Sequence, residues 1–180
     1  MALFKRLARF IGLEASLTNI VAGNTAPAFS LKALDGKSYS LNSLLEKGPV
    51  VVAFFKISCP VCQFTFPFLQ RLAERYAGDG VTFLGVSQDD AKSTQEFNRE
   101  FGVKFPVLLD EENYPVSNAY GLSSVPTIFL IAPGGKVTVS CMGFGKSDLE
   151  QIANTLAERR KLPPAPVFRP DENVPAFKPG

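Results

Sequence analysis

The chain has 180 residues and a formal net charge of +2, with 46% hydrophobic and 20% charged residues. This length and composition predict one compact domain with a substantial core rather than two domains. The near-neutral charge, without a basic cluster among aromatic residues, argues against a nucleic-acid partner, and no apolar run approaches the about 20 residues of a membrane span.

Residues 1–22 have the pattern of an amphipathic basic helix, since Lys5, Arg6 and Arg9 alternate with apolar side chains. Glu14 interrupts the apolar stretch after these charges, which is atypical of a signal peptide. We therefore expect a cytoplasmic protein, with peripheral membrane association as an alternative. We expect the helix to pack on the domain or on a second subunit, so a homodimer is one prediction.

A strand and a helix are predicted on either side of two cysteines. Residues 50–55 are β-branched or aromatic apart from one alanine, which predicts a buried strand, and residues 60–76 carry apolar side chains at helical spacing. Cys59 is predicted to cap this helix. Pro60 then takes the first helical position, where its missing N–H costs nothing.

The placement of Cys59 and Cys62 indicates a redox pair. The free amides of the first helical turn and the helix dipole stabilise a thiolate at Cys59, which makes it the expected nucleophile. Cys62, one turn further in, is expected to be less exposed and to attack a mixed disulfide on Cys59, which releases the reduced partner. The plain alternative is two half-buried structural cysteines.

Further elements are predicted in the second half of the chain. A strand is predicted over residues 81–87, a second buried strand over 128–131, and a hairpin turn at 133–136 before a strand over 137–142. Cys141 lies on this last strand. We interpret it as a small core residue, with an intermolecular disulfide as the alternative.

Six prolines lie between positions 163 and 180. Such a segment is expected to be extended or disordered and unable to join a helix or a sheet. Its apolar side chains Val167, Phe168 and Phe177 are candidates for wrapping the segment around the domain.

Taken in order, these motifs resemble the thioredoxin superfamily, in particular its redoxin branch of AhpC/TSA and TlpA-like domains. The resemblance covers about residues 24–160 and rests on several features of the sequence. These are the CxxC pair, Pro67 inside its helix, Val125-Pro126 before a buried strand, Gly143, the lead-in at 26–41 and the blocks at 83–89, 105–110 and 119–121.

The resemblance implies an α/β fold of the thioredoxin-like class over residues 23–162. A central mixed sheet is flanked by helices, with an N-terminal hairpin and a central redoxin insertion. It also implies a cis bond before Pro126. The expected substrate groove is lined by Pro60, Val61, Val125, Pro126 and Gly143, and the backbone of Val125 pairs with an extended substrate.

The implied function is thiol–disulfide exchange without a bound cofactor or metal. The partners would be a disulfide-containing protein or a small-molecule disulfide, together with a thiol electron donor; a membrane partner is not expected. Because a reducing compartment makes a CxxC pair transient and catalytic, the cytoplasmic expectation favours reduction of protein disulfides.

The chain departs from the family pattern next to the cysteines. Ser58 stands where many members have tryptophan, and Ala53 stands where thioredoxins have a buried aspartate that helps deprotonate the second cysteine. Asp89, in a loop, is a candidate for the missing acid, with helix capping as the alternative. Lys56 is a candidate for lowering a thiolate pKa, with a solvated strand end as the alternative.

Two other functions use the same cysteines. A peroxiredoxin-like peroxidase would need a threonine or serine three residues before the cysteine, a proline seven before and an arginine. This chain has Lys56 and Val52 at the first two positions and no arginine near Val125-Pro126. A non-enzymatic thiol metal-binding module would use Cys59 and Cys62 as soft ligands but normally needs histidine, which the chain lacks.

Overall fold

The computed structural model describes residues 19–180. The predicted helix over residues 1–22 therefore falls almost wholly outside the described residues, and residues 19–22 are not helical. Within the described range, no helix is both long enough and apolar enough to cross a bilayer.

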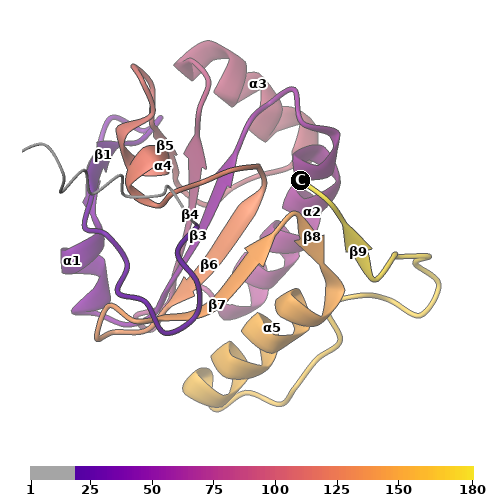
Figure 1. Ribbon diagram of the computed structural model, residues 1–180. Coiled ribbons are helices and arrows are strands. Elements are labelled where there is room, and N and C mark those ends of the chain that lie inside the picture. The colour runs from indigo at the N-terminus through magenta and orange to yellow at the C-terminus, as the bar shows by residue number, and fades with distance from the viewer. Residues whose placement is uncertain (1–18) are drawn as a thin grey trace, which may run out of the picture.

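Strand β3 (Val50–Phe55) is the middle of a five-stranded sheet with the order β5-β4-β3-β6-β7 (Figure 1). It runs parallel to β4 (Thr82–Ser87), which is parallel to β5 (Val107–Leu109). On its other side β6 (Thr127–Ile131) is antiparallel to β3, and β7 (Val137–Met142) is antiparallel to β6. The predicted mixed sheet is confirmed, with β4 beginning one residue later than expected.

One face of the sheet packs against three helices. The ring of Phe55 contacts Phe66 of α2 (Pro60–Tyr76) at a centroid distance of 4.3 Å and Phe97 of α3 (Ala91–Phe101) at 4.8 Å. Helix α5 (Lys146–Arg160) completes this layer. Because side chains alternate along a strand, the neighbouring residues of β3 point to the opposite face.

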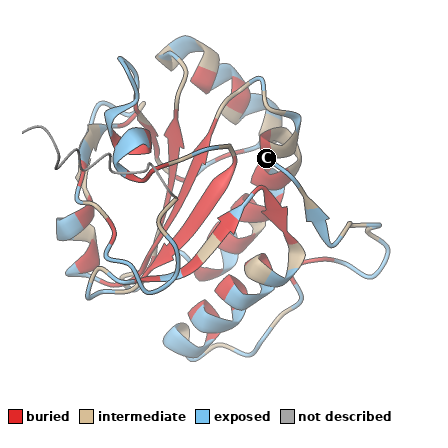
Figure 2. Cartoon of the chain, viewed as in Figure 1, coloured by how far each residue is buried: buried red, intermediate tan, exposed pale blue. Residues whose placement is uncertain are grey.

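The opposite face is covered by shorter elements. Phe54 packs on the ring of Tyr120 at 5.0 Å, in a cluster that includes residues of α1 (Leu41–Leu45) and α4 (Pro115–Ala119). Figure 2 shows the resulting burial, with the sheet strands mostly buried and the outer helix faces exposed. Both layers form because β3 is apolar at every position.

The expected additions to the sheet are present. Strands β1 (Ser30–Lys32) and β2 (Ser38–Ser40) form the N-terminal antiparallel hairpin. The central insertion supplies the edge strand β5 and the short helix α4.

The segment 163–180 differs from the prediction. Phe177–Lys178 forms β9, which pairs antiparallel with β8 (Phe144–Gly145), so the expectation that prolines exclude this segment from a sheet was wrong. The prolines nearest to this strand, Pro175 and Pro179, lie outside the two paired positions and so do not remove a donor from the ladder. Of the three apolar side chains named as candidates for wrapping the segment around the domain, Val167 and Phe168 are buried, whereas 58% of Phe177 is exposed.

Substitution of Phe66 by alanine is expected to lower the free energy of unfolding by about 3–5 kcal/mol, because its fully buried ring packs against the rings of Phe55, Phe97 and Phe105. Chemical denaturation measures this change. The exposed Phe177 provides the matched control, and Phe177→Ala should change stability by about 0.5 kcal/mol or less. Equal losses in the two variants would contradict the assigned core.

Candidate active site

The sheet brings two loops together at one edge. Strand β3 ends at this edge and the antiparallel strand β6 begins there, because Phe54 is paired with Thr127. The loop after β3 leads to Cys59, and the loop that precedes β6 contains Val125 and Pro126. The antiparallel pairing therefore places the two predicted halves of the site next to each other.

Cys59 is the N-cap of α2, as predicted. Its backbone is extended, and its Sγ accepts a hydrogen bond from the N–H of Cys62 at 3.2 Å. The thiol of Cys59 donates to the carbonyl oxygen of Val125, also at 3.2 Å. Pro60 occupies the first helical turn without leaving an unmet donor. The sulfur of Cys59 thus faces the loop that contains Val125.

Cys62 lies behind Cys59 and has no exposed surface. Burial raises the pKa of its thiol, and the hydrogen bond with Cys59 and the charges of Cys59 and Asp89 raise it further. Cys62 therefore remains a protonated thiol at neutral pH, and it must lose a proton before it can attack a disulfide.

Asp89 supports the loop before Cys59. Its Oδ2 accepts a hydrogen bond from the backbone N–H of Ile57 at 2.8 Å, and the side-chain amide of Gln63 donates to the carbonyl of Ile57 at the same distance. The helix-capping alternative applies to its neighbour, since Asp90 accepts from the N–H of Ser93 at the start of α3. The acid that sequence analysis singled out thus lies beside the cysteines.

Lys56 makes a contact that sequence analysis did not anticipate. Its Nζ lies 5.5 Å from the ring centroid of Tyr114, at the start of α4, which is a cation–π geometry. The suggested effect of Lys56 on a thiolate stays a prediction.

The predicted groove residues gather beside Cys59. The bond between Val125 and Pro126 is cis, as predicted. The N–H of Gly143 donates to the carbonyl of Pro126 at 2.7 Å, which brings the glycine to the same loop. Gly143 has φ +79°, a conformation that favours glycine.

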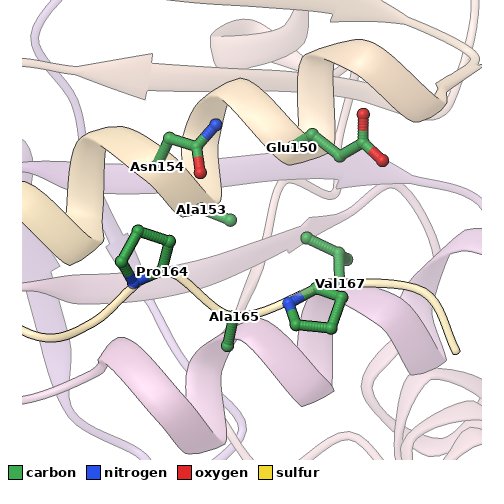
Figure 3. A pocket seen from close by; sticks show the side chains of 7 residues that line it. Glu150, Ala153, Asn154, Pro164, Ala165 and Val167 are labelled. Atoms are coloured by element: carbon green, nitrogen blue, oxygen red, sulfur yellow. The ribbon is translucent and has the colours of Figure 1, made fainter.

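Two cavities differ in their relation to this site. A cavity of about 210 Å³ is lined by Gln88 and residues 122–125, so it adjoins Val125. A larger cavity of about 340 Å³ lies between α5 and the segment 163–180 (Figure 3). Its lining includes none of the predicted site residues. Sequence analysis missed Gln88 and residues 122–124, because loop residues follow no helical or strand spacing.

Sequence analysis also missed residues 178–180, which lie against Gly143 and Val125. The proline-rich composition of residues 163–180 predicted an extended chain but carried no information about where that chain would lie.

Cys141 is a core residue, as we interpreted it. It is buried, its Sγ lies 3.5 Å from the carbonyl oxygen of Gly143, and burial with the nearby charge of Asp148 raises the pKa of its thiol to about 12.

Among residues 19–180, no three His, Cys, Asp or Glu side chains are grouped as a metal ion would require.

Comparison with known proteins decides the family. The AhpC/TSA family profile matches residues 22–140. The chain belongs to the AhpC/TSA family. Among similar proteins is the thiol-disulfide oxidoreductase ResA of Geobacillus thermodenitrificans (strain NG80-2). It is 35% identical to this chain over 136 residues, which cover 74% of this chain and 77% of ResA.

Solved structures share the fold of this chain. The thioredoxin domain of a thiol-disulfide oxidoreductase from Bacteroides vulgatus matches with a TM-score of 0.67 and 25% identity, covering 76% of this chain and 98% of that domain. The peroxidoxin BcpB of Mycobacterium tuberculosis gives a TM-score of 0.63 at 24% identity, covering 81% and 99%, which shows the fold alone. With its CxxC pair, this AhpC/TSA protein is a thiol–disulfide oxidoreductase of thioredoxin-like fold.

The three thiols should differ in reactivity. At pH 7, iodoacetamide is expected to alkylate Cys59 first, because Cys62 and Cys141 are buried and their raised pKa values leave little thiolate. For Cys141 the rise from 9.0 to about 12 lowers the thiolate fraction about a thousandfold. Peptide mass spectrometry measures the labelling. Equal rates at Cys59 and Cys62 in the folded protein, as expected only in denaturant, would contradict this assignment.

Proposed function

We propose that Cys59 and Cys62 are the redox-active pair and that the protein reduces disulfide bonds in other proteins. The observation that carries this proposal is the position of the Cys59 sulfur. It lies at a helix N-cap, 3.2 Å from the Val125 carbonyl, with the buried thiol of Cys62 behind it. A sulfur in this position can meet a substrate disulfide from the groove side while Cys62 approaches from the protein side.

The exchange transfers two electrons in two steps. The thiolate of Cys59 attacks one sulfur of the substrate disulfide, and the bond that breaks leaves the other substrate sulfur as a thiolate, which takes up a proton. Cys62 then loses its proton and attacks the Cys59 sulfur. The mixed disulfide breaks, the second substrate sulfur leaves as a thiol after protonation, and a Cys59–Cys62 disulfide remains. A thiol electron donor reduces this disulfide again.

Proton removal from Cys62 needs an acceptor. The position of the usual buried acid holds Ala53, which is in the core. Asp89 is the carboxylate whose charge acts on the Cys62 thiol. We infer that Asp89 accepts this proton, directly or through one water molecule.

The reducing direction rests on the proposed cytoplasmic location, for which the composition of residues 1–22 is the support. A homodimer formed through those residues and peripheral membrane association stay predictions. Equilibration with glutathione tests the direction. A potential near −270 mV is typical of a reductase, whereas one near −120 mV would indicate an oxidant.

Replacing each cysteine separately should separate the two steps. Cys59→Ser is expected to abolish reduction of a disulfide-bonded protein, because no nucleophile remains at the groove. Cys62→Ser is expected to trap a mixed disulfide on Cys59, which mass spectrometry detects. Cys141→Ser is the matched control and should keep the exchange rate. A rate unaffected by Cys59→Ser would overturn the mechanism, and rapid consumption of hydrogen peroxide by Cys59 would favour the peroxidase alternative.

Asp89→Asn distinguishes a proton acceptor from a mere neighbouring charge. Since the Asp89 charge raises the pKa of Cys62, its removal alone should lower that pKa and speed the second step at neutral pH. Loss of a proton acceptor should instead slow that step by about a hundredfold or more. We expect the second step to slow, which stopped-flow measurement of substrate release from the mixed disulfide detects. The rate at which Cys59 is alkylated should stay unchanged.

The control is Asp90→Asn, which alters the cap of α3 without touching the loop before Cys59. An equal loss in both variants would indicate a general structural effect. A faster second step in Asp89→Asn would contradict the role of Asp89 as acceptor.

A further inference from the structure

The segment 163–180 is fixed to the surface of α2 before it reaches the site. The guanidinium of Arg71 donates to both carboxylate oxygens of Glu172, at 2.7 and 2.9 Å, and to the carbonyl of Val167 at 2.6 Å. The buried ring of Phe168 packs on Phe68 with a centroid distance of 5.0 Å. These contacts direct the following residues toward the amino end of α2.

The segment then joins a sheet next to the groove. The N–H of Lys146 donates to the carbonyl of Ala176 at 2.9 Å, and Phe144 is paired with Lys178 in the β8–β9 ladder. Strand β8 begins directly after Gly143. The pairing of β9 with β8 therefore brings residues 177 and 178 next to Gly143. Figure 1 shows β9 beside β8, with the end of the described chain near α2.

The last residues fill the space beside Val125. A Cβ atom on Gly143 would collide with the carbonyl oxygen of Lys178 and would lie 2.8 Å from the nitrogen of Gly180. A Cβ atom on Gly180 would lie 2.8 Å from the carbonyl oxygen of Val125 and 3.1 Å from Oγ of Ser124. The Val125 carbonyl is also the acceptor for the thiol of Cys59. The carbonyl group of Val125 therefore lies between Gly180 and the sulfur of Cys59 and is close to both.

A charged contact links the same residues to the CxxC helix. The Nζ of Lys178 lies 4.9 Å from the ring centroid of Phe64, two residues after Cys62. Residues 177–180 thus contribute a short strand, the ammonium group of Lys178 over the ring of Phe64, and Gly180, which has no side chain, against Val125.

We propose that the surface formed by β8, Gly143 and Val125 binds extended polypeptide, and that residues 177–180 occupy it as an intramolecular competitor of the substrate. This inference rests on the proposed function. A protein substrate must displace residues 177–180 to lie along Val125, whereas a small disulfide needs less of this surface. The segment therefore sets which substrates reach Cys59.

The contacts of residues 177–180 are few enough to be exchanged. They comprise a two-residue ladder, one cation–π contact and close backbone packing, while the stronger contacts of Arg71 and Phe168 lie earlier in the segment. A tethered segment acts at an effective concentration of the order of millimolar. Because the stronger contacts of the segment lie before residue 177, removal of residues 177–180 should leave the fold intact and expose the surface beside Val125.

Insulin reduction, with dithiothreitol as donor, tests the proposal. Deletion of residues 177–180 is expected to raise kcat/KM for insulin at least about threefold, mainly through a lower KM, with a smaller change for oxidised glutathione. A peptide of residues 174–180 at millimolar concentration should inhibit the deletion variant competitively. Lys92→Ala is the control, because Lys92 is an exposed lysine of α3 that is not among the residues of the proposed surface. It should leave the rates with insulin and with oxidised glutathione unchanged.

Gly180→Val keeps the segment complete but places a side chain against the Val125 carbonyl, so it should reproduce the deletion. Thermal unfolding of both variants should match the unaltered chain. An unchanged kcat/KM for insulin in both variants, while reduction still depends on Cys59, would overturn the competitor and leave the proposed function standing. Absence of insulin reduction in the unaltered chain and in both variants would overturn the proposed function itself.

Discussion

The antiparallel pairing of β3 with β6 is the constraint on which the site depends. Pairing of Phe54 with Thr127 fixes the two loops at one sheet edge, where the thiol of Cys59 donates a hydrogen bond to the carbonyl of Val125. A shift of one residue would reverse the faces of β6 and separate the sulfur from its acceptor. Since β3 is buried on both faces and paired on both sides, this register is strongly determined.

The two cysteines are three residues apart but have different surroundings because α2 begins between them. Cys59 lies before the first turn, where helix N–H groups are free, and Cys62 lies inside the first turn against the core. One helix start therefore yields one accessible sulfur and one buried sulfur. The hydrogen bond from the N–H of Ile57 to Asp89 connects the loop before this helix to the loop that follows β4.

Local patterns predicted the parts of the fold that burial dictates. The strand at 50–55 and the helix at 60–76 were predicted at their observed bounds, because a continuous apolar run and a helical apolar spacing are both readable in sequence. The cis bond at Pro126 and the position of Gly143 required the family resemblance. Long-range contacts were not predictable: nothing in the sequence signals that Lys56 meets Tyr114 or that Phe177–Lys178 pairs with β8.

The stretch matched by the AhpC/TSA profile ends at residue 140, before Gly143, β8 and residues 178–180, which lie against Gly143 and Val125. The CxxC pair and the residues that lie against Val125 from the C-terminal segment thus belong to different portions of one chain. A portion that meets the rest through one short ladder and a few side chains can change in sequence without disturbing the sulfur pair. If residues 177–180 compete with substrate as proposed, substitutions confined to them would alter substrate range in this chain while the profile-matched stretch stays the same.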